Sequence, residues 1–274
     1  MIMKKVAVLL SVCAFSINAL AQHSLEKIWI TDSTSLRNPE SVLVDSKSKT
    51  LFVSNIGEFG KEGVGFVSKL TPDGKVTKAD WVTGLDATKG LGMYKNNLYA
   101  AENHSVAVID IAKGTIAKRI PIDGAVMLND ITVDSKGIVY VSDSKTGKVH
   151  RIEGDMPTTY LEGLNGINGL LAVDKDLYIL ADGVFQKAGA DKKVTVIAKG
   201  VEGGADGIEM VGKNEFLLTG WGGTIYYAKD GNLQLLSDTR DKKVNAVDLG
   251  YDASSKTVYI PQMTSHKVVA YKLK

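Results

Sequence analysis

The chain has 274 residues, and its 33 basic and 31 acidic side chains nearly balance. Because no basic block or arginine-rich face stands out, nucleic acid is not an expected partner. The only cysteine, Cys13, lies in the N-terminal segment, so the rest of the chain has no thiol for disulfides, thiolate catalysis or cysteine-bound zinc.

The N-terminal segment has the pattern of an export signal. Two lysines precede an apolar run over 6–17, and Ala19-Leu20-Ala21 supplies the small residues of a cleavage site. The apolar run is too short for a permanent membrane span. We therefore predict a signal peptide over 1–21, a mature chain over 22–274, and a periplasmic or secreted location after cleavage near Ala21.

The mature chain repeats a pattern of short strands about every 40 residues. Apolar strands begin directly after a polar residue at six places, namely Glu40, Lys89, Asn129, Asn168, Asp206 and, less sharply, Asp248. The steps between them are 49, 40, 39, 38 and about 42 residues. This period is typical of propeller blades, and the sequence therefore predicts one all-β domain, a six-bladed β-propeller with four-stranded antiparallel blades.

Alternating polar and apolar residues, bounded by turn residues, locate the strands of each blade. In chain order the first three blades are predicted at 41–44, 51–54, 65–70 and 76–82; at 90–94, 98–101, 106–111 and 115–120; and at 131–133, 139–143, 148–153 and 158–161. Blades 4 and 5 have second strands at 177–181 and 216–220 and outer strands near 194–197 and 233–236. Blade 6 has only three strands, at 248–251, 258–260 and 267–273.

A separate strand at 26–30 begins the mature chain. We expect it to complete blade 6 and close the ring, because closure removes the open end between the first and last blades. Ile28, Trp29 and Ile30 are expected to be buried there.

These six polar residues at the strand starts, here called the ring residues, should meet on the propeller axis. Glycine follows three of them, at Gly90, Gly169 and Gly207, where it would let neighbouring backbones approach. The alternative is that each polar residue only caps a turn, but turn capping does not select glutamate or lysine.

Four segments carry a more specific resemblance. Asn38-Pro39-Glu40, Leu128-Asn129-Asp130, Asn168-Gly169-Leu170 and Asp206-Gly207-Ile208 each lead into a strand, with second strands like Val139-Tyr140-Val141-Ser142-Asp143. In this the whole mature chain resembles the regucalcin/gluconolactonase-like family of six-bladed propellers. The resemblance implies a divalent cation held by Glu40, Asn168 and Asp206, with Asn129 contacting substrate or metal-bound water.

The chemistry of these residues fits a hard cation. Carboxylate and amide oxygens suit Ca²⁺, with Mg²⁺ or Mn²⁺ as alternatives, and leave coordination positions open. Such an ion can polarise a lactone or ester carbonyl and activate water. Asp206 is the candidate general base, and the expected partner is a small-molecule substrate of a lactonase or esterase.

Two residues depart from the family pattern. Lys89 occupies the second ring position, where it could neutralise the acids without a metal, bind an anionic part of the substrate, or extend to solvent at the rim. Met127 stands where members of the family tend to carry an arginine for the sugar acid. Gluconolactone itself is therefore not the expected substrate.

The loops between the second and third strands of each blade should surround the opening of the site on the axis. They supply Phe59, His104 and Trp221 as further candidate substrate contacts. The chain contains no Gly-x-Ser-x-Gly elbow, His-Glu-x-x-His helix or phosphate-binding glycine loop.

One alternative function stays open from the sequence. The chain could be a non-catalytic, NHL-like or YncE-like exported propeller that binds a peptide, a glycan or another surface ligand through its top face.

Overall fold

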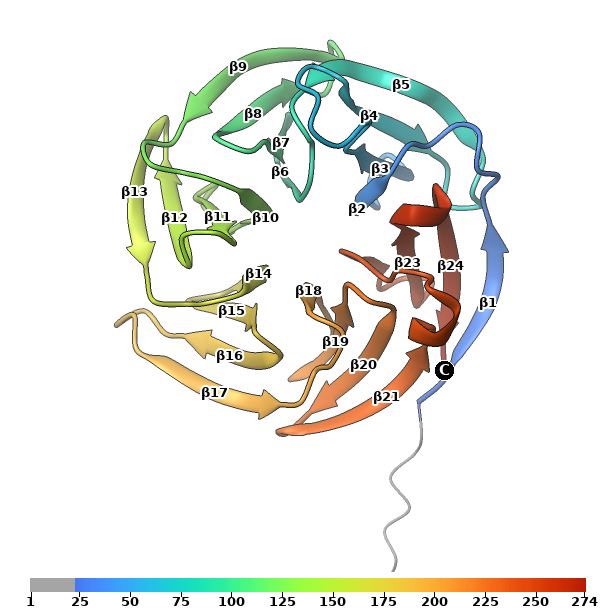
Figure 1. Cartoon of the computed structure of the whole chain (residues 1–274), viewed down its shortest axis with the longest axis vertical. Helices are drawn as coiled ribbons and strands as arrows, with labels where there is room; N and C mark the ends of the chain where they lie inside the picture. The colour runs from blue at the N-terminus through green and yellow to red at the C-terminus, as the bar shows by residue number, and fades with distance from the viewer. Residues whose placement is uncertain (1–22) are drawn as a thin grey trace, which may run out of the picture.

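Six sheets stand around a common axis in the computed structural model, which describes residues 23–274 (Figure 1). Each sheet has four strands, and neighbouring strands within it are antiparallel. The predicted six-bladed propeller is therefore confirmed. The export signal lies outside the described residues. Within them, no helix is long and apolar enough to cross a bilayer.

The strands follow the chain from the axis outwards in the first five blades. Blade 1 consists of β2 (Pro39–Asp45), β3 (Thr50–Asn55), β4 (Gly65–Leu70) and β5 (Val76–Leu85), and blade 2 of β6 (Leu91–Tyr94), β7 (Asn97–Ala101), β8 (Ser105–Asp110) and β9 (Thr115–Pro121). Blade 3 consists of β10 (Leu128–Val133), β11 (Val139–Asp143), β12 (Lys148–Glu153) and β13 (Met156–Leu161).

The second half of the ring repeats this order. Blade 4 consists of β14 (Ile167–Val173), β15 (Asp176–Ala181), β16 (Val184–Ala188) and β17 (Val194–Lys199), and blade 5 of β18 (Ala205–Gly212), β19 (Glu215–Gly220), β20 (Thr224–Lys229) and β21 (Asn232–Asp238). Blade 6 consists of β22 (Gly250–Asp252), β23 (Thr257–Gln262), β24 (Lys267–Leu273) and β1 (Leu25–Ile30). Two short 3-10 helices, η1 (Arg240–Lys242) and η2 (Met263–Ser265), occupy loops.

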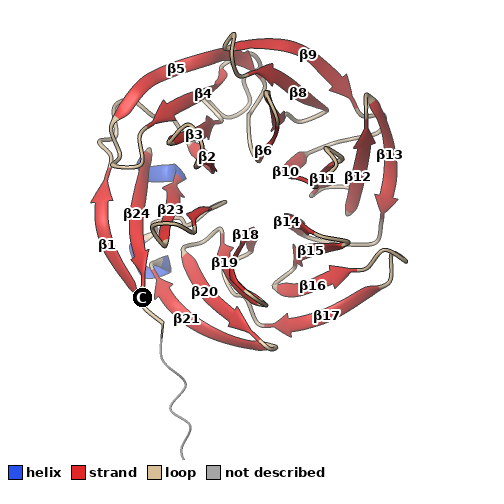
Figure 2. Ribbon diagram, turned by 180° about the vertical axis from the view of Figure 1, so that it is seen from behind, coloured by secondary structure: helices blue, strands red, loops and turns tan. Residues whose placement is uncertain are grey.

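The first strand closes the ring as predicted, since β1 pairs with β24 at the outer edge of blade 6 (Figure 2). The expected burial of this strand is only partly right. Trp29 packs beside Tyr259 and donates its indole N–H to Pro72 O at 3.0 Å, which ties the closure strand to blade 1. Ile28 and Ile30 remain 51% and 44% exposed, because their side chains lie on the outer face of an edge strand.

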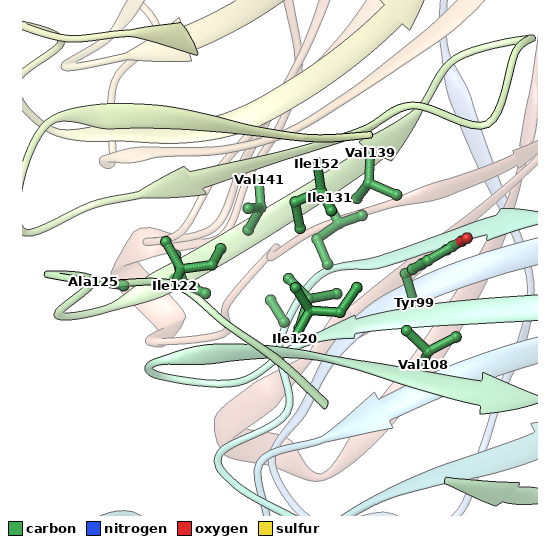
Figure 3. Packing of buried hydrophobic residues seen from close by; sticks show 12 residues of the cluster. Tyr99, Val108, Ile120, Ile122, Ala125, Ile131, Val139, Val141 and Ile152 are labelled. Carbon is green, nitrogen blue, oxygen red and sulfur yellow. The ribbon is translucent and has the colours of Figure 1, made fainter. Parts of the chain in front are cut away.

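The core lies in layers between adjacent blades. In the layer between blades 2 and 3, Tyr99, Val108 and Ile120 face Ile131 and Val141 (Figure 3). This follows from strand geometry, because alternate side chains of each sheet point towards the preceding or the following blade. The inner strands are thereby packed around the axis, where the candidate site lies.

Candidate functional site

A β-bulge interrupts the inner strand at the start of four blades. The register between first and second strands gains one residue between Pro39 and Val42, Leu128 and Ile131, Ile167 and Leu170, and Ala205 and Ile208. A bulge of this kind bends the strand and re-aims the side chains beside it. Glu40, Asn129, Asn168 and Asp206, all predicted from the sequence, lie inside these bulges.

A hydroxyl group on the second strand satisfies the backbone of three bulges. In each of them, the N–H of the second bulge residue would otherwise be left without its ladder partner. The bonds run from Ser41 N to Ser54 Oγ (2.9 Å), from Asp130 N to Ser142 Oγ (2.9 Å) and from Gly207 N to Thr219 Oγ1 (2.8 Å). The polar residue near the end of each second strand therefore supports the site from behind.

The glycines beside the ring residues allow the close approach that was predicted. A Cβ atom on Gly90 would lie 2.6 Å from Asp130 Cα, and one on Gly207 would lie 2.9 Å from Asp248 Cα. At Gly169 the carbonyl oxygen of Asp206 would be closer still. Because none of these glycines has a positive φ, neighbouring backbone rather than local conformation requires them.

These contacts also correct the placement of Asp248. Asp248 lies against Gly207 in the way that Asp130 lies against Gly90. It therefore corresponds to Asp130, one residue after the ring position of its blade, and not to Asn129. The ring position of blade 6 is occupied instead by Val247, which is fully buried with Ile56 and Met263. Asp130 and Asp248 therefore form a second acidic layer, which the sequence reasoning did not single out.

Glu40 and Asp206 are buried acids that lack hydrogen-bond donors. Glu40 is 4% exposed and Asp206 is 1% exposed, and neither Glu40 Oε2 nor either oxygen of Asp206 has a partner. Burial raises the pKa of Glu40 to about 8, helped by repulsion from Asp248 and opposed by Lys89. Burial, followed by repulsion from Glu40, also raises the pKa of Asp206 well above its usual range.

Lys89 is buried but does not pair with these carboxylates. Its ammonium donates to Ala87 O at 3.1 Å and to Asn103 Oδ1 at 2.9 Å. Among residues 23–274 it makes no ion pair within 4 Å, and burial lowers its pKa while Glu40 partly offsets this. With 8% exposure, Lys89 does not extend to solvent at the rim.

The second acidic layer is better satisfied. Asp130 accepts the backbone N–H groups of Ile131 (2.7 Å) and Leu170 (2.6 Å), and Asp248 Oδ2 accepts the Ser41 hydroxyl at 2.5 Å. Burial nevertheless raises the pKa of Asp248 to about 6. A cavity of about 190 Å³ borders this layer and is also lined by Glu209.

The two asparagines are held through their amide nitrogens. Asn129 Nδ2 donates to Ser144 Oγ at 3.0 Å, and Asn168 Nδ2 donates to Ala205 O at 3.2 Å. The amide oxygen of Asn129 is buried without a partner. Both asparagines therefore keep an oxygen available for a cation or a donor.

The residues fit a hard cation if amide oxygens take part. Within the described range, no group of three or more His, Cys, Asp and Glu side chains comes together in a way that could hold a metal. Two carboxylates with unpartnered oxygens and one or two carboxamides are ligands that Ca²⁺ and Mg²⁺ accept, alongside water. Zinc would require a different set.

The predicted rim residues make no bond to this arrangement. Phe59 and Trp221 are 63% and 49% exposed, and the exposed His104 is held through Nδ1 against Ala125 O at 2.8 Å. In the described part of the chain, none of the three forms a hydrogen bond or ion pair with an axial residue. Their role as substrate contacts stays a prediction.

Comparison with known proteins gives structural likeness only. No family model and no curated protein matches the sequence. A gluconolactonase from Xanthomonas campestris aligns with a TM-score of 0.70 at 17% identity, over 87% of each chain. An inactive virginiamycin B lyase from Staphylococcus aureus with quinupristin aligns at 0.65 and 13% identity, over 92% of this chain and 100% of that one. A streptogramin B lyase aligns at 0.63 and 14% identity, over 92% and 98%.

Identities this low establish a common fold and nothing more. The chain is a six-bladed propeller similar in fold to a gluconolactonase, a virginiamycin B lyase and a streptogramin B lyase.

Proposed function

We propose that this protein is an exported, divalent-cation-dependent hydrolase of a lactone or ester, with its active site on the propeller axis. The observation that carries the proposal is the pair of buried carboxylates, Glu40 and Asp206, whose oxygens lack hydrogen-bond donors. Such groups are costly in a folded protein unless they are protonated or meet a cation. The likeness to a gluconolactonase fold supports the same reaction class.

Glu40, Asn168 and Asp206 would hold the cation, with Ca²⁺ as the first candidate and Mg²⁺ or Mn²⁺ as alternatives. When bound, such an ion supplies Lewis-acid polarisation of a carbonyl and lowers the pKa of water. The asparagine is held in place by its bond to Ala205 O, so its ligand oxygen needs little reorganisation.

Asp206 is the proposed general base. Both of its oxygens lack protein donors, so one can face the cation while the other accepts a proton from the attacking water. Its burial excludes bulk water from that proton transfer.

Two further residues would orient the substrate. The Asn129 oxygen is buried and unpartnered, so it can accept a hydrogen bond from a substrate hydroxyl or from water. Lys89 uses two acceptors, Ala87 O and Asn103 Oδ1, and an ammonium has three N–H donors. The third donor can contact an oxygen of the substrate.

The test is a panel of lactones and esters, assayed with EDTA and with added Ca²⁺, Mg²⁺ or Mn²⁺. Asp206→Asn should lower kcat by at least 100-fold, on the order of magnitude for loss of a general base, while Asp155→Asn should not, because Asp155 lies in an exposed pair with Lys118. Full activity of Asp206→Asn, or turnover that is unaffected by EDTA, would refute the assignment.

Product analysis separates hydrolysis from elimination, which the similarity to lyases makes worth measuring. Hydrolysis in H₂¹⁸O places one labelled oxygen in the product acid. Elimination breaks the carbon–oxygen bond on the alcohol side, takes up no label and leaves a carbon–carbon double bond.

A second candidate is a non-catalytic propeller that binds a peptide or glycan. The exposed aromatic side chains Phe59 and Trp221 favour it, because exposed aromatics are common in binding surfaces. In that case the panel shows no turnover, and millimolar Ca²⁺ does not raise the melting temperature.

A further inference from the structure

A cavity of about 390 Å³ lies between the loop that joins β3 to β4 in blade 1 and the η2 loop of blade 6. Its lining residues are Arg37, Asn38, Gly57, Glu58, Phe59 and His266. This rim cavity is separate from the axial residues, none of which lines it. Its volume is in the range of small-molecule sites.

Hydrogen bonds fix the blade 1 side of the rim cavity. Arg37 N donates to Asn55 Oδ1 at 2.9 Å, and Gly57 N donates to Arg37 O at 3.2 Å. Asn38 Nδ2 returns a bond to Gly57 O at 2.9 Å. Gly57 itself has φ +81° and lies too close to the Val64 carbonyl for any side chain. These contacts fix the backbone of the wall on the blade 1 side.

A hydrogen bond between the lead-in to β2 and the η2 loop sets the tautomer of the neutral imidazole of His266. The backbone N–H of Asn38 donates to His266 Nδ1 at 3.0 Å. Because Nδ1 is the acceptor, the neutral ring carries its proton on Nε2 and offers an N–H donor there.

The rim cavity has more donors than acceptors. The Arg37 guanidinium is exposed and, within residues 23–274, makes no ion pair or side-chain hydrogen bond. The one acid in the lining, Glu58, is already paired with Lys61 Nζ at 2.7 Å. The Phe59 ring supplies an exposed aromatic surface beside them.

We propose that the rim cavity binds an organic carboxylate, that is, a carboxylate attached to an aromatic or apolar group. The planar guanidinium of Arg37 matches a carboxylate in two parallel hydrogen bonds, and the Nε2–H of His266 adds a third donor. Phe59 packs against the apolar part of the ligand. A neutral ligand of the same shape leaves the guanidinium without its counter-charge.

This site extends the proposed function, and only the link to catalysis rests on it. Asn38, which lines the rim cavity, precedes Glu40 by two residues in the chain, so the same segment contributes to both places. The substrate would then be an ester or lactone that also carries a free carboxylate.

The experiment measures binding without turnover, in EDTA and with no divalent cation. Phenylacetate is titrated into ¹⁵N-labelled protein, and the dissociation constant is taken from amide shifts of residues 55–64 and 263–267. Phenylacetamide serves as the neutral analogue and acetate as the carboxylate without a ring. We expect phenylacetate to bind at least tenfold more tightly than either, as expected for charge-assisted hydrogen bonds plus aromatic contact.

Variants identify the groups that bind. Arg37→Gln should weaken phenylacetate at least tenfold and Phe59→Ser severalfold, whereas Arg151→Gln, which loses an arginine already paired with Glu153, should have no effect. Circular dichroism and melting temperature establish that each variant is folded. Equal binding of phenylacetamide, or an unchanged constant in Arg37→Gln, overturns the proposal.

One further variant separates the rim cavity from the axis. Asp206→Asn should bind phenylacetate as the wild type does, whether or not the wild type proves to be a hydrolase. If Asp206→Asn alone changes the binding, the carboxylate binds on the axis and the rim proposal is wrong. If the rim binds phenylacetate but no ester is turned over, the proposed function fails while the rim site stands.

Discussion

Replacing Glu209 with glutamine should flatten the dependence of stability on pH. Glu209 lines the cavity below the axial site, and burial together with repulsion from Asp248 raises its pKa from 4.5 to about 8. Between these two values the folded protein binds more protons than the unfolded chain, so the free energy of unfolding falls as pH rises. The stabilisation is complete below pH 4.5 and is lost above about pH 8.

The size of the effect follows from the same values. One pKa unit corresponds to about 1.4 kcal/mol, so a rise from 4.5 to about 8 sets an upper limit of about 5 kcal/mol. Because Glu209 is only partly buried and faces a cavity, solvent screening reduces this, and we expect about 2 kcal/mol. Glutamine keeps the shape and cannot ionise.

The assay is urea denaturation in EDTA at pH 5 and pH 9. The wild type should lose about 2 kcal/mol more than Glu209→Gln between the two conditions, and Glu153→Gln, an exposed carboxyl, should behave as the wild type. Equal losses in the wild type and Glu209→Gln would show that Glu209 is ionised at neutral pH without penalty.

Three further outcomes are expected. Millimolar Ca²⁺ should raise the melting temperature by several degrees, since a ligand at about 100 times its Kd adds about 2.7 kcal/mol to the free energy of unfolding. Asp206→Asn should abolish this rise. A rise that survives the substitution would place the ion elsewhere. Thr219→Val removes a hydroxyl that accepts the bulge N–H of blade 5 and donates to a neighbouring carbonyl, so it should lower the free energy of unfolding in urea by about 1–3 kcal/mol. The control Thr195→Val, at an exposed position, should lower it by under 0.5 kcal/mol. Equal losses in the two variants would contradict the role given to the hydroxyl in the bulge. Trp29→Ala should lower the free energy of unfolding by about 2–3 kcal/mol, because it removes the contact that ties the closure strand to blade 1. Ile28→Ala, at an exposed position, should lower it by under 0.5 kcal/mol. The reverse order would mean that β1 is held by its outer face.

The fold was predictable because its signals are local. Turn residues and alternation placed strands such as β4 (Gly65–Leu70) and β11 (Val139–Asp143) at their observed bounds, and most others within two or three residues. The closure strand followed from counting, since blade 6 was one strand short. The burial of its isoleucines could not be predicted, because alternation does not say which face of an edge strand is covered.

The candidate site was predictable only in outline. Glu40 and Asp206 could be expected near one another from the repeat, but their bulges could not, because in both blades a hydroxyl in the next strand replaces a ladder bond. The second acidic layer was missed for the same reason. In a regular strand Asp130 would point away from Asn129, and only the bulge brings both towards the axis.

Blade 6 provides an internal comparison that bears on function. Val247 holds the position that Glu40 and Asp206 hold in other blades, and it is fully buried against Ile56 and Met263. An apolar side chain therefore satisfies the fold at this position at no electrostatic cost. Buried carboxylates without donors destabilise a protein unless something compensates them, and the buried ammonium of Lys89 is engaged with Asn103 instead. The acids on the axis are thus not required by propeller geometry, and the proposed cation would account for carboxyl groups that the protein leaves without donors.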